Sequence, residues 1–116
     1  MAVIEQTCRE KGSVLAVADV GRAKEIKEGS DGISFLYNGQ PYRLSMHGIF
    51  QAENAICAIE TIRMLMFAEP DLFSDITKKD IRDGLMHTSW PGRLEQIASD
   101  PDVYIDGAHN IGAAEV

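Results

Sequence analysis

The feature that most constrains the fold of this chain is the segment 51–68, which reads QAENAICAIETIRMLMFA. Its apolar residues recur at the i, i+3, i+4, i+7 spacing of an α-helix, and further Ala, Met and Leu residues widen the apolar stripe until it nearly encircles the helix. A helix with this pattern is expected to be buried on most of its surface. Pro70 ends it, because proline lacks the amide hydrogen that a helix interior needs.

The segments that precede this helix favour β-structure. Residues 33–37 and 40–46 are joined by Asn38-Gly39, the strongest short hairpin signal, because a type I′ turn needs positive φ at both central residues. Residues 14–18 form a short apolar run bounded by Gly and Asp, which indicates a buried strand. Residues 19–31 are charged and predict a loop or an edge strand.

Two further helices are expected. Residues 2–10 read as the end of a helix, which a Gly-Ser pair would stop. Thr77 and Asp80 form a capping-box pattern, with Asp80 in the place of the usual Glu. The helix behind this cap would direct Ile81 and Leu85 inward.

The last part of the chain begins with a breaker cluster at 90–93. Residues 94–98 and 103–105 flank a polar turn and predict a second hairpin; a polar stretch at 106–110 follows, and 111–116 opens like a helix. A strand, a polar turn and a helix opening are typical of the start of an α/β unit, yet no partner strand follows. We therefore expect a piece of a larger α/β protein with a domain boundary near 90–93. A complete small domain remains the alternative.

The composition is that of an ordinary globular protein. The 116 residues are 45% hydrophobic and 25% charged, which argues against intrinsic disorder. The net charge of -7 argues against nucleic-acid binding, which needs a basic surface. No stretch approaches the about 20 apolar residues of a membrane span, and the first residues do not resemble a signal peptide. Cys8 and Cys57 lack metal-ligand spacing, so we expect reduced, buried thiols in a cytoplasmic protein.

Gln51 and Asn54 are the first candidate ligand-binding residues. They stand three positions apart at the start of the helix and therefore share one face. The Asn54 side chain offers a donor and an acceptor together, which suits the edge of a nucleobase. The simpler interpretation is a helix-capping region in which Asn54 is solvated.

Arg93, Asp106 and His109 are the other candidates. Arg93 follows a rigid Pro-Gly turn, and its planar guanidinium suits phosphate oxygens, unless it simply pairs with Glu95 or Asp100. Asp106 ends a strand before a helix, where open α/β sheets bind ligands, and its carboxylate suits ribose hydroxyls. His109 suits the orientation of a substrate or a contact with phosphate. The alternative for Asp106 and His109 is an ordinary turn.

Taken together, these motifs resemble a known family. The segment GIFQAENAICAIETIRML is similar to the G-x-x-Q-x-x-N-A-x-x-A segment of the Mur ligase superfamily. WPGRLEQI, followed at short distance by YIDGAHN, resembles its folylpolyglutamate synthase branch, because cell-wall Mur ligases usually carry Asp-Asp-Tyr-Ala-His-Asn at the second motif. The resemblance runs from about Gly48 to the end of the chain, and more loosely over the β-rich segment before it.

The resemblance implies an α/β fold in two parts. Residues 1–88 would be the C-terminal part of a Mur-ligase-type central ATP-binding domain, 89–93 the interdomain linker, and 94–116 the first strands of a Rossmann-like C-terminal domain. The chain has no GxxxxGK[ST] phosphate loop. The loop, the Mg²⁺ ligands and the modified lysine of the family would lie upstream. We therefore expect this chain alone to bind ATP weakly and to be inactive.

The resemblance also implies an activity for the parent protein. The γ-carboxyl of a folyl-polyglutamate would take the γ-phosphoryl group of ATP, with Mg²⁺, to form an acyl phosphate that the amino group of L-glutamate attacks. Dihydrofolate synthesis from dihydropteroate is a second activity that the sequence does not separate from the first. The expected partners are thus folate or dihydropteroate, L-glutamate and ATP, in a monomeric parent that binds neither nucleic acid nor membrane.

The same resemblance assigns roles to individual residues. Asn54 matches the residue on the adenine side, Arg93 the linker residue that binds the phosphates of ATP, and Asp106 the residue that holds the ribose. His109 matches the neighbouring histidine of the catalytic centre. Phe50 stands where many members of the family have His, which leaves that position without an assigned role.

Two other classes of function stay open at this point. One is a cell-wall Mur-type amide ligase, which the use of a murein precursor instead of a folate would identify. The other is a non-catalytic module that responds to a nucleotide or binds a protein, which a stably folded isolated chain with a defined partner would favour.

Overall fold

A three-stranded antiparallel sheet forms the centre of the structure. The computed structural model describes residues 2–114. The strands are β1 (Ala23–Gly29), β2 (Gly32–Tyr37) and β3 (Gln40–Leu44), in the spatial order β1-β2-β3. The predicted hairpin between β2 and β3 is confirmed, because Asn38 and Gly39 have φ of 50° and 72°, the positive values that a type I′ turn needs.

One face of this sheet is buried, because the side chains of its strands alternate. Ile33, Phe35 and Tyr37 of β2 and Tyr42 and Leu44 of β3 are buried, whereas the residues between them are partly or fully exposed. Phe35 lies opposite Tyr42 in the register, and their stacked rings have centroids 5.6 Å apart. The buried face therefore presents a continuous apolar surface to the helices.

The strand β1 is the exposed edge of the sheet. All its residues except Ala23 are exposed, and most of them are charged or Gly. Its ladder with β2 is irregular between Lys24 and Lys27, where Glu25 has a φ of 52°. Charge and a bulge protect a sheet edge against pairing with another chain, so the expectation of an edge strand is confirmed.

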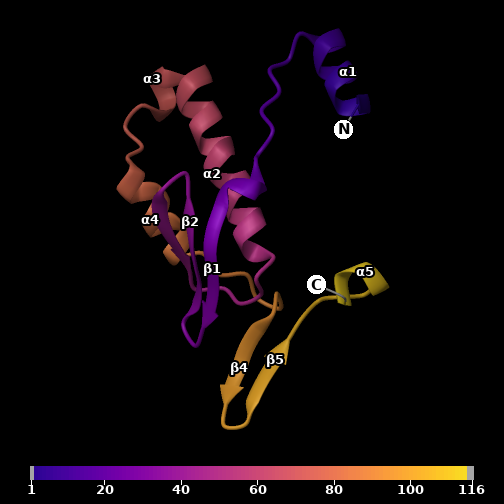
Figure 1. Cartoon of the computed structure of the whole chain (residues 1–116), viewed down its shortest axis with the longest axis vertical. Coiled ribbons are helices and arrows are strands. Elements are labelled where there is room, and N and C mark those ends of the chain that lie inside the picture. Colours follow the sequence, from indigo (N-terminus) through magenta and orange to yellow (C-terminus); the bar gives the residue numbers. More distant parts are fainter. Residues whose placement is uncertain (1, 115–116) are drawn as a thin grey trace.

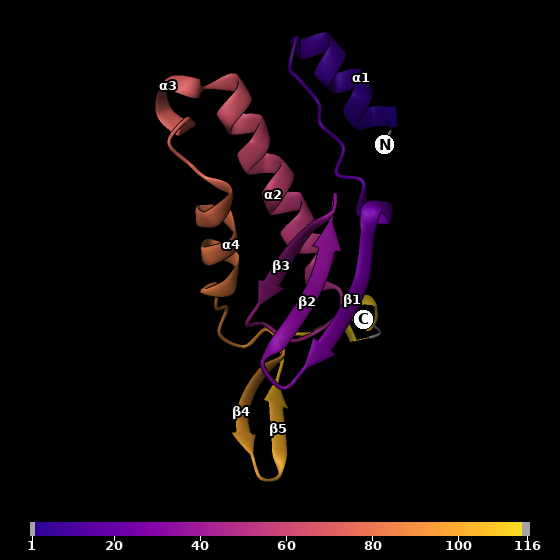
Figure 2. The same ribbon diagram turned by 60° about the vertical axis from the view of Figure 1, so that its left-hand side comes forward.

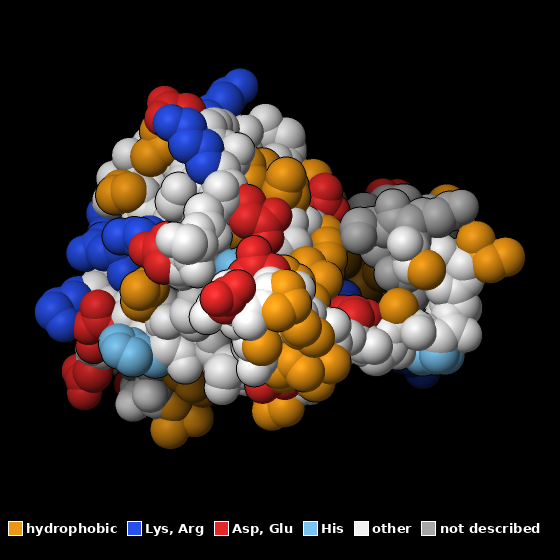
Figure 3. Space-filling view, turned by 90° about the horizontal axis from the view of Figure 1, so that it is seen from below, with side chains coloured by type: hydrophobic (Ala, Val, Ile, Leu, Met, Phe, Trp, Pro, Cys, Tyr) orange, Lys and Arg blue, Asp and Glu red, His pale blue; other side chains and the backbone are white. Residues whose placement is uncertain are grey.

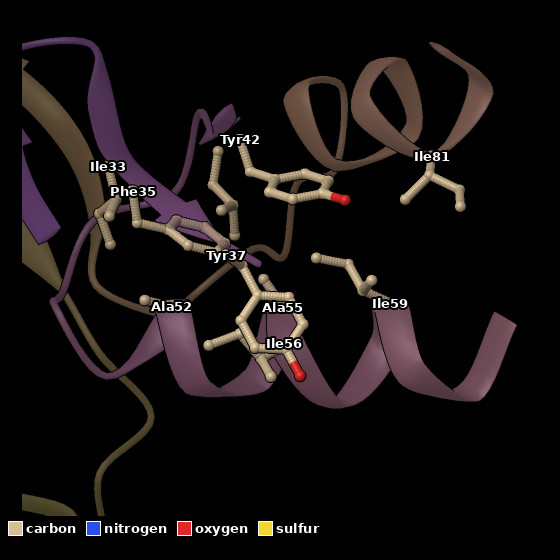
Figure 4. Packing of buried hydrophobic residues seen from close by; sticks show 10 residues of the cluster. Ile33, Phe35, Tyr37, Tyr42, Ala52, Ala55, Ile56, Ile59 and Ile81 are labelled. Carbon is tan, nitrogen blue, oxygen red and sulfur yellow. The ribbon is translucent and has the colours of Figure 1, made fainter. Parts of the chain in front are cut away.

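The helix α2 (Gln51–Ala68) covers the apolar face of the sheet (Figure 2). Its buried apolar residues, Ala52, Ala55, Ile56 and Ile59, meet the aromatic side chains of β2 and β3 (Figure 4). The predicted helix has the predicted bounds, but the expectation that it is buried on most of its surface was wrong. Its second half runs past the sheet (Figure 1), and Phe67 there is 81% exposed.

The helix α4 (Lys78–Met86) packs beside β3 and adds Ile81 to the core. It follows the short α3 (Pro70–Phe73) and begins with the predicted capping box. The Asp80 amide donates to Thr77 Oγ1 at 3.2 Å, and the Thr77 amide donates to Asp80 Oδ2 at 2.8 Å. Both predictions for this helix, its cap and its inward face, are confirmed.

The N-terminal segment departs from the prediction. The helix α1 (Ala2–Lys11) forms as expected and ends at Gly12, but none of its residues is buried. Residues 14–18 are not a buried strand: they are extended, and Val14 and Val17 are exposed. Within residues 2–114 no strand pairs with them, and a strand without a partner leaves its backbone groups to water. A 3₁₀ turn (Val20–Arg22) then leads into β1.

The C-terminal part forms a separate antiparallel hairpin of β4 (Glu95–Ser99) and β5 (Asp102–Ile105). The hairpin extends away from the main sheet (Figure 1). Hydrophobic side chains gather on the face of the molecule that is seen from below in the orientation of Figure 1 (Figure 3). The helix α5 (Ile111–Ala114) follows, so the helix predicted for 111–116 is confirmed to residue 114, and the rest lies outside the described residues.

The elements thus make a mixed α and β structure, as the sequence predicted at that coarse level. Every strand pair within residues 2–114 is antiparallel. No helix in this range combines the length and the apolar character of a membrane span. Cys8 and Cys57 are free thiols, but Cys57 is exposed and Cys8 only half-buried, so the expectation of buried thiols was wrong. Cys57 lies beside the exposed segment 14–18 instead of the core.

Replacing Ile56 by Ala should lower the free energy of unfolding by about 2–5 kcal/mol, because the Ile56 side chain of α2 is fully buried in the core. The matched control is Phe67→Ala on the exposed half of the same helix, which should change it by about 0.5 kcal/mol or less. Urea unfolding followed by circular dichroism measures both. Equal losses for the two variants would contradict the described packing.

The capping box should also be visible in a titration. The hydroxyl and amide of Thr77 donate to the Asp80 carboxylate and hold its pKa below the ordinary value of 3.8. The stabilisation by the ionised group is therefore present above pH 3.8 and is lost as the pH falls through the lowered pKa. In Thr77→Val the pKa of Asp80, measured by NMR, should rise toward 3.8.

Candidate functional site

A tight loop brings the chain from β3 into α2 and shapes the candidate site. Gly48 has a φ of 92°, and a Cβ atom at this residue would lie 2.4 Å from Cε1 of Phe50. Its amide donates to Glu28 Oε1 at 2.9 Å, which ties the loop to β1. The Gln51 amide donates to the Gly48 carbonyl at 2.8 Å and closes the first turn of the helix. Only glycine permits this close packing of Phe50 over the loop.

A cavity of about 440 Å³ opens beside this helix start. It lies between the end of β3, the first turns of α2, the end of α4 and the segment 88–93. Its apolar walls come from Leu44, Met46, Ala55, Ala58, Leu85 and Trp90, and its polar groups from Gln51, Asn54, Thr88 and Arg93. Apolar walls with a few converging polar groups are typical of small-molecule sites, and this volume lies within their usual range.

Two side-chain amides face each other in this cavity. Asn54 Nδ2 donates to Gln51 Oε1 at 2.7 Å. Gln51 is 3% exposed, whereas Asn54 is exposed and accessible to a ligand. Among residues 2–114 nothing bonds to Gln51 Nε2, although it is buried. The bond between the two amides therefore leaves a donor of Gln51 and the oxygen of Asn54 for other partners.

Arg93 lines the same cavity from the segment 88–93, which connects α4 to β4 and is called the linker below. Its guanidinium carbon lies 4.9 Å from the centroid of the Phe50 ring, a cation–π contact. The alternative that Arg93 pairs with Glu95 or Asp100 is wrong, because Glu95 Oε2 accepts instead from the Gly92 amide at 2.7 Å. Among the described residues, the guanidinium has no carboxylate partner and remains available to an anion.

Asp106 has a different surrounding. Its Oδ2 accepts from the Leu94 amide at 2.7 Å, and its Oδ1 accepts from the Ala108 amide at 2.7 Å. Leu94 has a φ of 45°, a conformation that few non-Gly residues adopt, and the bond from Asp106 helps to hold it. The Gly107 amide donates to the Gly92 carbonyl at 2.7 Å beside it. Asp106 therefore fastens the end of β5 to the linker and does not line the cavity.

The candidate residues Asn54, Arg93, Asp106 and His109 are thus brought together only in part. Asn54 and Arg93 share one cavity, and Asp106 contacts the residue that follows Arg93. His109 lies apart from the cavity, exposed, with its Nδ1 3.0 Å from the Gly107 carbonyl. Sequence reasoning missed the support of Arg93 by Phe50, because no spacing rule relates a helix start to a distant linker.

The described residues contain no cluster of three or more His, Cys, Asp or Glu side chains that would hold a metal ion. The groups beside the cavity instead fit an organic ligand with an anionic part. Gln51 and Asn54 offer hydrogen bonds to a polar edge, and Arg93, which lines the same cavity, offers a positive charge.

Replacing Asp106 by Ala should loosen the linker, since two backbone amides lose their acceptor. We expect the amides of Leu94 and Ala108 to exchange with deuterium at least about tenfold faster, while those of α2 keep their protection. The matched control is Asp75→Ala, at an exposed position outside the linker. Unchanged exchange at Leu94 and Ala108 in the Asp106 variant would contradict this role.

Comparisons with known proteins agree with the motifs. No family model matches the chain. The chain is 38% identical over 68 residues to the dihydrofolate synthase/folylpolyglutamate synthase of Bacillus subtilis, covering 59% of this chain and 15% of that protein. It is 37% identical over 84 residues to the folylpolyglutamate synthase of Lacticaseibacillus casei, covering 68% of this chain and 19% of that protein. The aligned residues therefore span less than a fifth of the length of these relatives.

Solved structures extend the match over nearly the whole chain. The folylpolyglutamate synthetase from Lactobacillus casei superposes with a TM-score of 0.77 at 27% identity, covering 98% of this chain and 30% of that one. A complex of the synthase with AMPPCP and folate gives a TM-score of 0.78, again over 98% of this chain and over 28% of that one. In both its motifs and its fold, the chain corresponds to a segment of folylpolyglutamate synthase, in the Mur ligase family.

Proposed function

We propose that a ligase containing this segment adds L-glutamate to the γ-carboxyl of folyl-polyglutamate with the use of ATP and Mg²⁺ through an acyl phosphate. Dihydrofolate synthesis from dihydropteroate is a second activity of the same site, since relatives of this chain carry both names. The proposal extends to cytoplasmic localisation and to a monomeric ligase. The cell-wall alternative has no specific support, because the relatives that match the chain are folate enzymes.

The observation that carries the proposal is the shared cavity of Asn54 and Arg93. Asn54 offers hydrogen bonds to a nucleobase edge, and Arg93 offers a positive charge to phosphates. A related structure holds AMPPCP, an analogue of ATP, together with folate. The cavity is therefore proposed as the adenine end of an ATP site, in which Arg93 meets the phosphates.

The residues of this chain would act mainly by position and charge. Phosphoryl transfer depends mostly on holding the reactants in line and on neutralising the developing charge. Arg93 would supply part of that charge from the linker, and Asn54 would hold the base. Asp106 fastens the linker, and its carboxylate retains lone pairs that suit a ribose hydroxyl. His109, near Asp106 in the sequence, is proposed as a residue of the catalytic centre.

The proposal includes a division into domains. Residues 1–88 would belong to the central ATP-binding domain, 89–93 to the linker and 94–116 to a Rossmann-like C-terminal domain. The separation of the β4–β5 hairpin from the main sheet supports this division (Figure 1). The phosphate loop and the Mg²⁺ ligands would come from other parts of the ligase, so this chain alone should be inactive.

The function is tested by replacing Arg93 with Ala in a full-length ligase that contains this segment. Because a hydrogen bond to a charged group is lost, kcat/KM for ATP should fall about 10- to 100-fold. The matched control is Arg82→Ala on α4, which lies outside the cavity and should leave kcat/KM nearly unchanged. Release of phosphate that depends on a folate and L-glutamate measures the reaction.

Two results would count against the proposal. Equal kinetics for the Arg93 and Arg82 variants would remove Arg93 from the nucleotide site. A wild-type ligase that consumes ATP with a murein precursor, and not with a folate or dihydropteroate, would replace the folate assignment by the cell-wall one.

A further inference from the structure

Glu28 of the edge strand β1 contacts the loop that leads into α2. Its Oε1 accepts from the Gly48 amide at 2.9 Å and lies 3.3 Å from Nδ1 of His47. The side chains of Glu25 and Lys27, on the same strand, form no hydrogen bond or ion pair with any residue in 2–114. Charge that only protects a sheet edge needs no such partners, so the contacts of Glu28 have another role.

The first contact connects Glu28 to the side chain of Arg93. The Phe50 ring lies so close to Gly48 that a Cβ atom there would be 2.4 Å from Phe50 Cε1. The guanidinium carbon of Arg93 in turn lies 4.9 Å from the centroid of this ring. A shift of the Gly48 backbone would therefore move the ring and, with it, the guanidinium.

The second contact connects β1 to the backbone beside Arg93. The side chain of His47 is 12% exposed, and its ring meets that of Tyr104 in β5 edge-on, with centroids 5.4 Å apart. Asp106, two residues after Tyr104, accepts from the Leu94 amide at 2.7 Å. Because Leu94 directly follows Arg93, the hairpin that His47 contacts is the one that fastens this part of the linker.

These two connections lie next to each other. Glu28, Gly48, Phe50 and Leu94 line one cavity of about 480 Å³. Because a cavity, and not packed side chains, separates these residues, close packing does not fix their relative positions. The hydrogen bond to Glu28 and the ring contacts must do so instead.

Resting on the proposed nucleotide site, we propose that Glu28 is a positioning residue for Arg93. One carboxylate oxygen holds two consecutive residues, which lead to the side chain of Arg93 on one side and to its backbone on the other. A misplacement of about 1 Å in a residue that positions a substrate can lower a reaction rate about 100-fold. Glu28 therefore acts through the location of Arg93 and needs no contact with the nucleotide.

The test is Glu28→Ala in a full-length ligase that contains this segment. Because Arg93 would meet the phosphates in a less favourable position, KM for ATP should rise about 3- to 10-fold, with KM for L-glutamate unchanged. A merely structural role would instead reduce the number of folded molecules. That would lower the apparent kcat and leave KM for ATP as in the wild type.

Two further single variants complete the comparison. Glu28→Gln keeps the length of the side chain and an oxygen that accepts from the Gly48 amide, so KM for ATP should stay within about twofold of the wild type. The matched control is Glu25→Ala on the same strand, which removes no side-chain contact and should leave KM for ATP unchanged.

A double-mutant cycle shows whether Glu28 acts through Arg93. In the Arg93→Ala background, Glu28→Ala should change KM for ATP by less than about twofold, because no guanidinium remains to be positioned. Two independent residues would instead multiply their effects.

The outcomes separate this inference from the function on which it rests. An unchanged KM for ATP in Glu28→Ala, multiplied effects in the cycle, or Glu28→Gln as impaired as Glu28→Ala overturns the inference. Each of these leaves Arg93 in the nucleotide site if Arg93→Ala alone lowers kcat/KM for ATP. Unchanged ATP kinetics in Arg93→Ala overturn the proposed site and the inference together.

Discussion

The packing of the first half of α2 against β2 and β3 is the interaction on which the candidate site depends. Ala52, Ala55, Ile56 and Ile59 lie on one face of the helix, and their burial sets its rotation about its own axis. With this rotation, the side chain of Gln51 is buried and that of Asn54 lines the cavity. A helix that turned to expose Ile56 would move both amides away from the cavity.

The walls of the cavity are joined by a few contacts that cross between distant parts of the chain. Ser45 Oγ, just after β3, donates to the Thr88 carbonyl at 2.9 Å, and Thr88 Oγ1 donates to the Gly84 carbonyl of α4 at 2.7 Å. The Phe50 ring then holds Arg93 through the cation–π contact. The end of β3, the end of α4 and the linker are therefore held around the start of α2 as one arrangement.

Local patterns account for the parts of the fold that were predicted correctly. The Asn38-Gly39 turn, the capping box at Thr77 and the bounds of α2 depend on neighbours within a few positions, so the sequence displays their causes directly. The segment 14–18 was wrongly predicted to be a buried strand. Its apolar run indicates β-strand propensity, but a strand also needs a partner strand with which to form hydrogen bonds. The second half of α2 was wrongly predicted to be buried, because its apolar residues also need a surface to pack against and the sheet does not extend that far.

The candidate site divides in a similar way. Asn54, Arg93 and Asp106 were found from residue type and motif, but their surroundings depend on tertiary contacts that no spacing reveals. Nothing in the order of residues shows that Asp106 accepts from the Leu94 amide, or that Gln51 Nε2 is buried without an acceptor. These facts appear only when helix, linker and hairpin are placed in space, and they distinguish a fastening residue from a ligand-binding one.

Phe50 is a better neighbour for a phosphate-binding Arg93 than a carboxylate side chain would be. A cation–π contact at an exposed site contributes about 0.5–1 kcal/mol, and it leaves the donors of the guanidinium edge free. A hydrogen bond to a charged group contributes about 1.5–3 kcal/mol, so a phosphate that met those donors would outweigh the contact with the ring. A carboxylate partner would occupy the same donors and would repel the incoming anion. An aromatic side chain at position 50 therefore orients the arginine while keeping its charge available, although it is not the histidine that many Mur ligases have there.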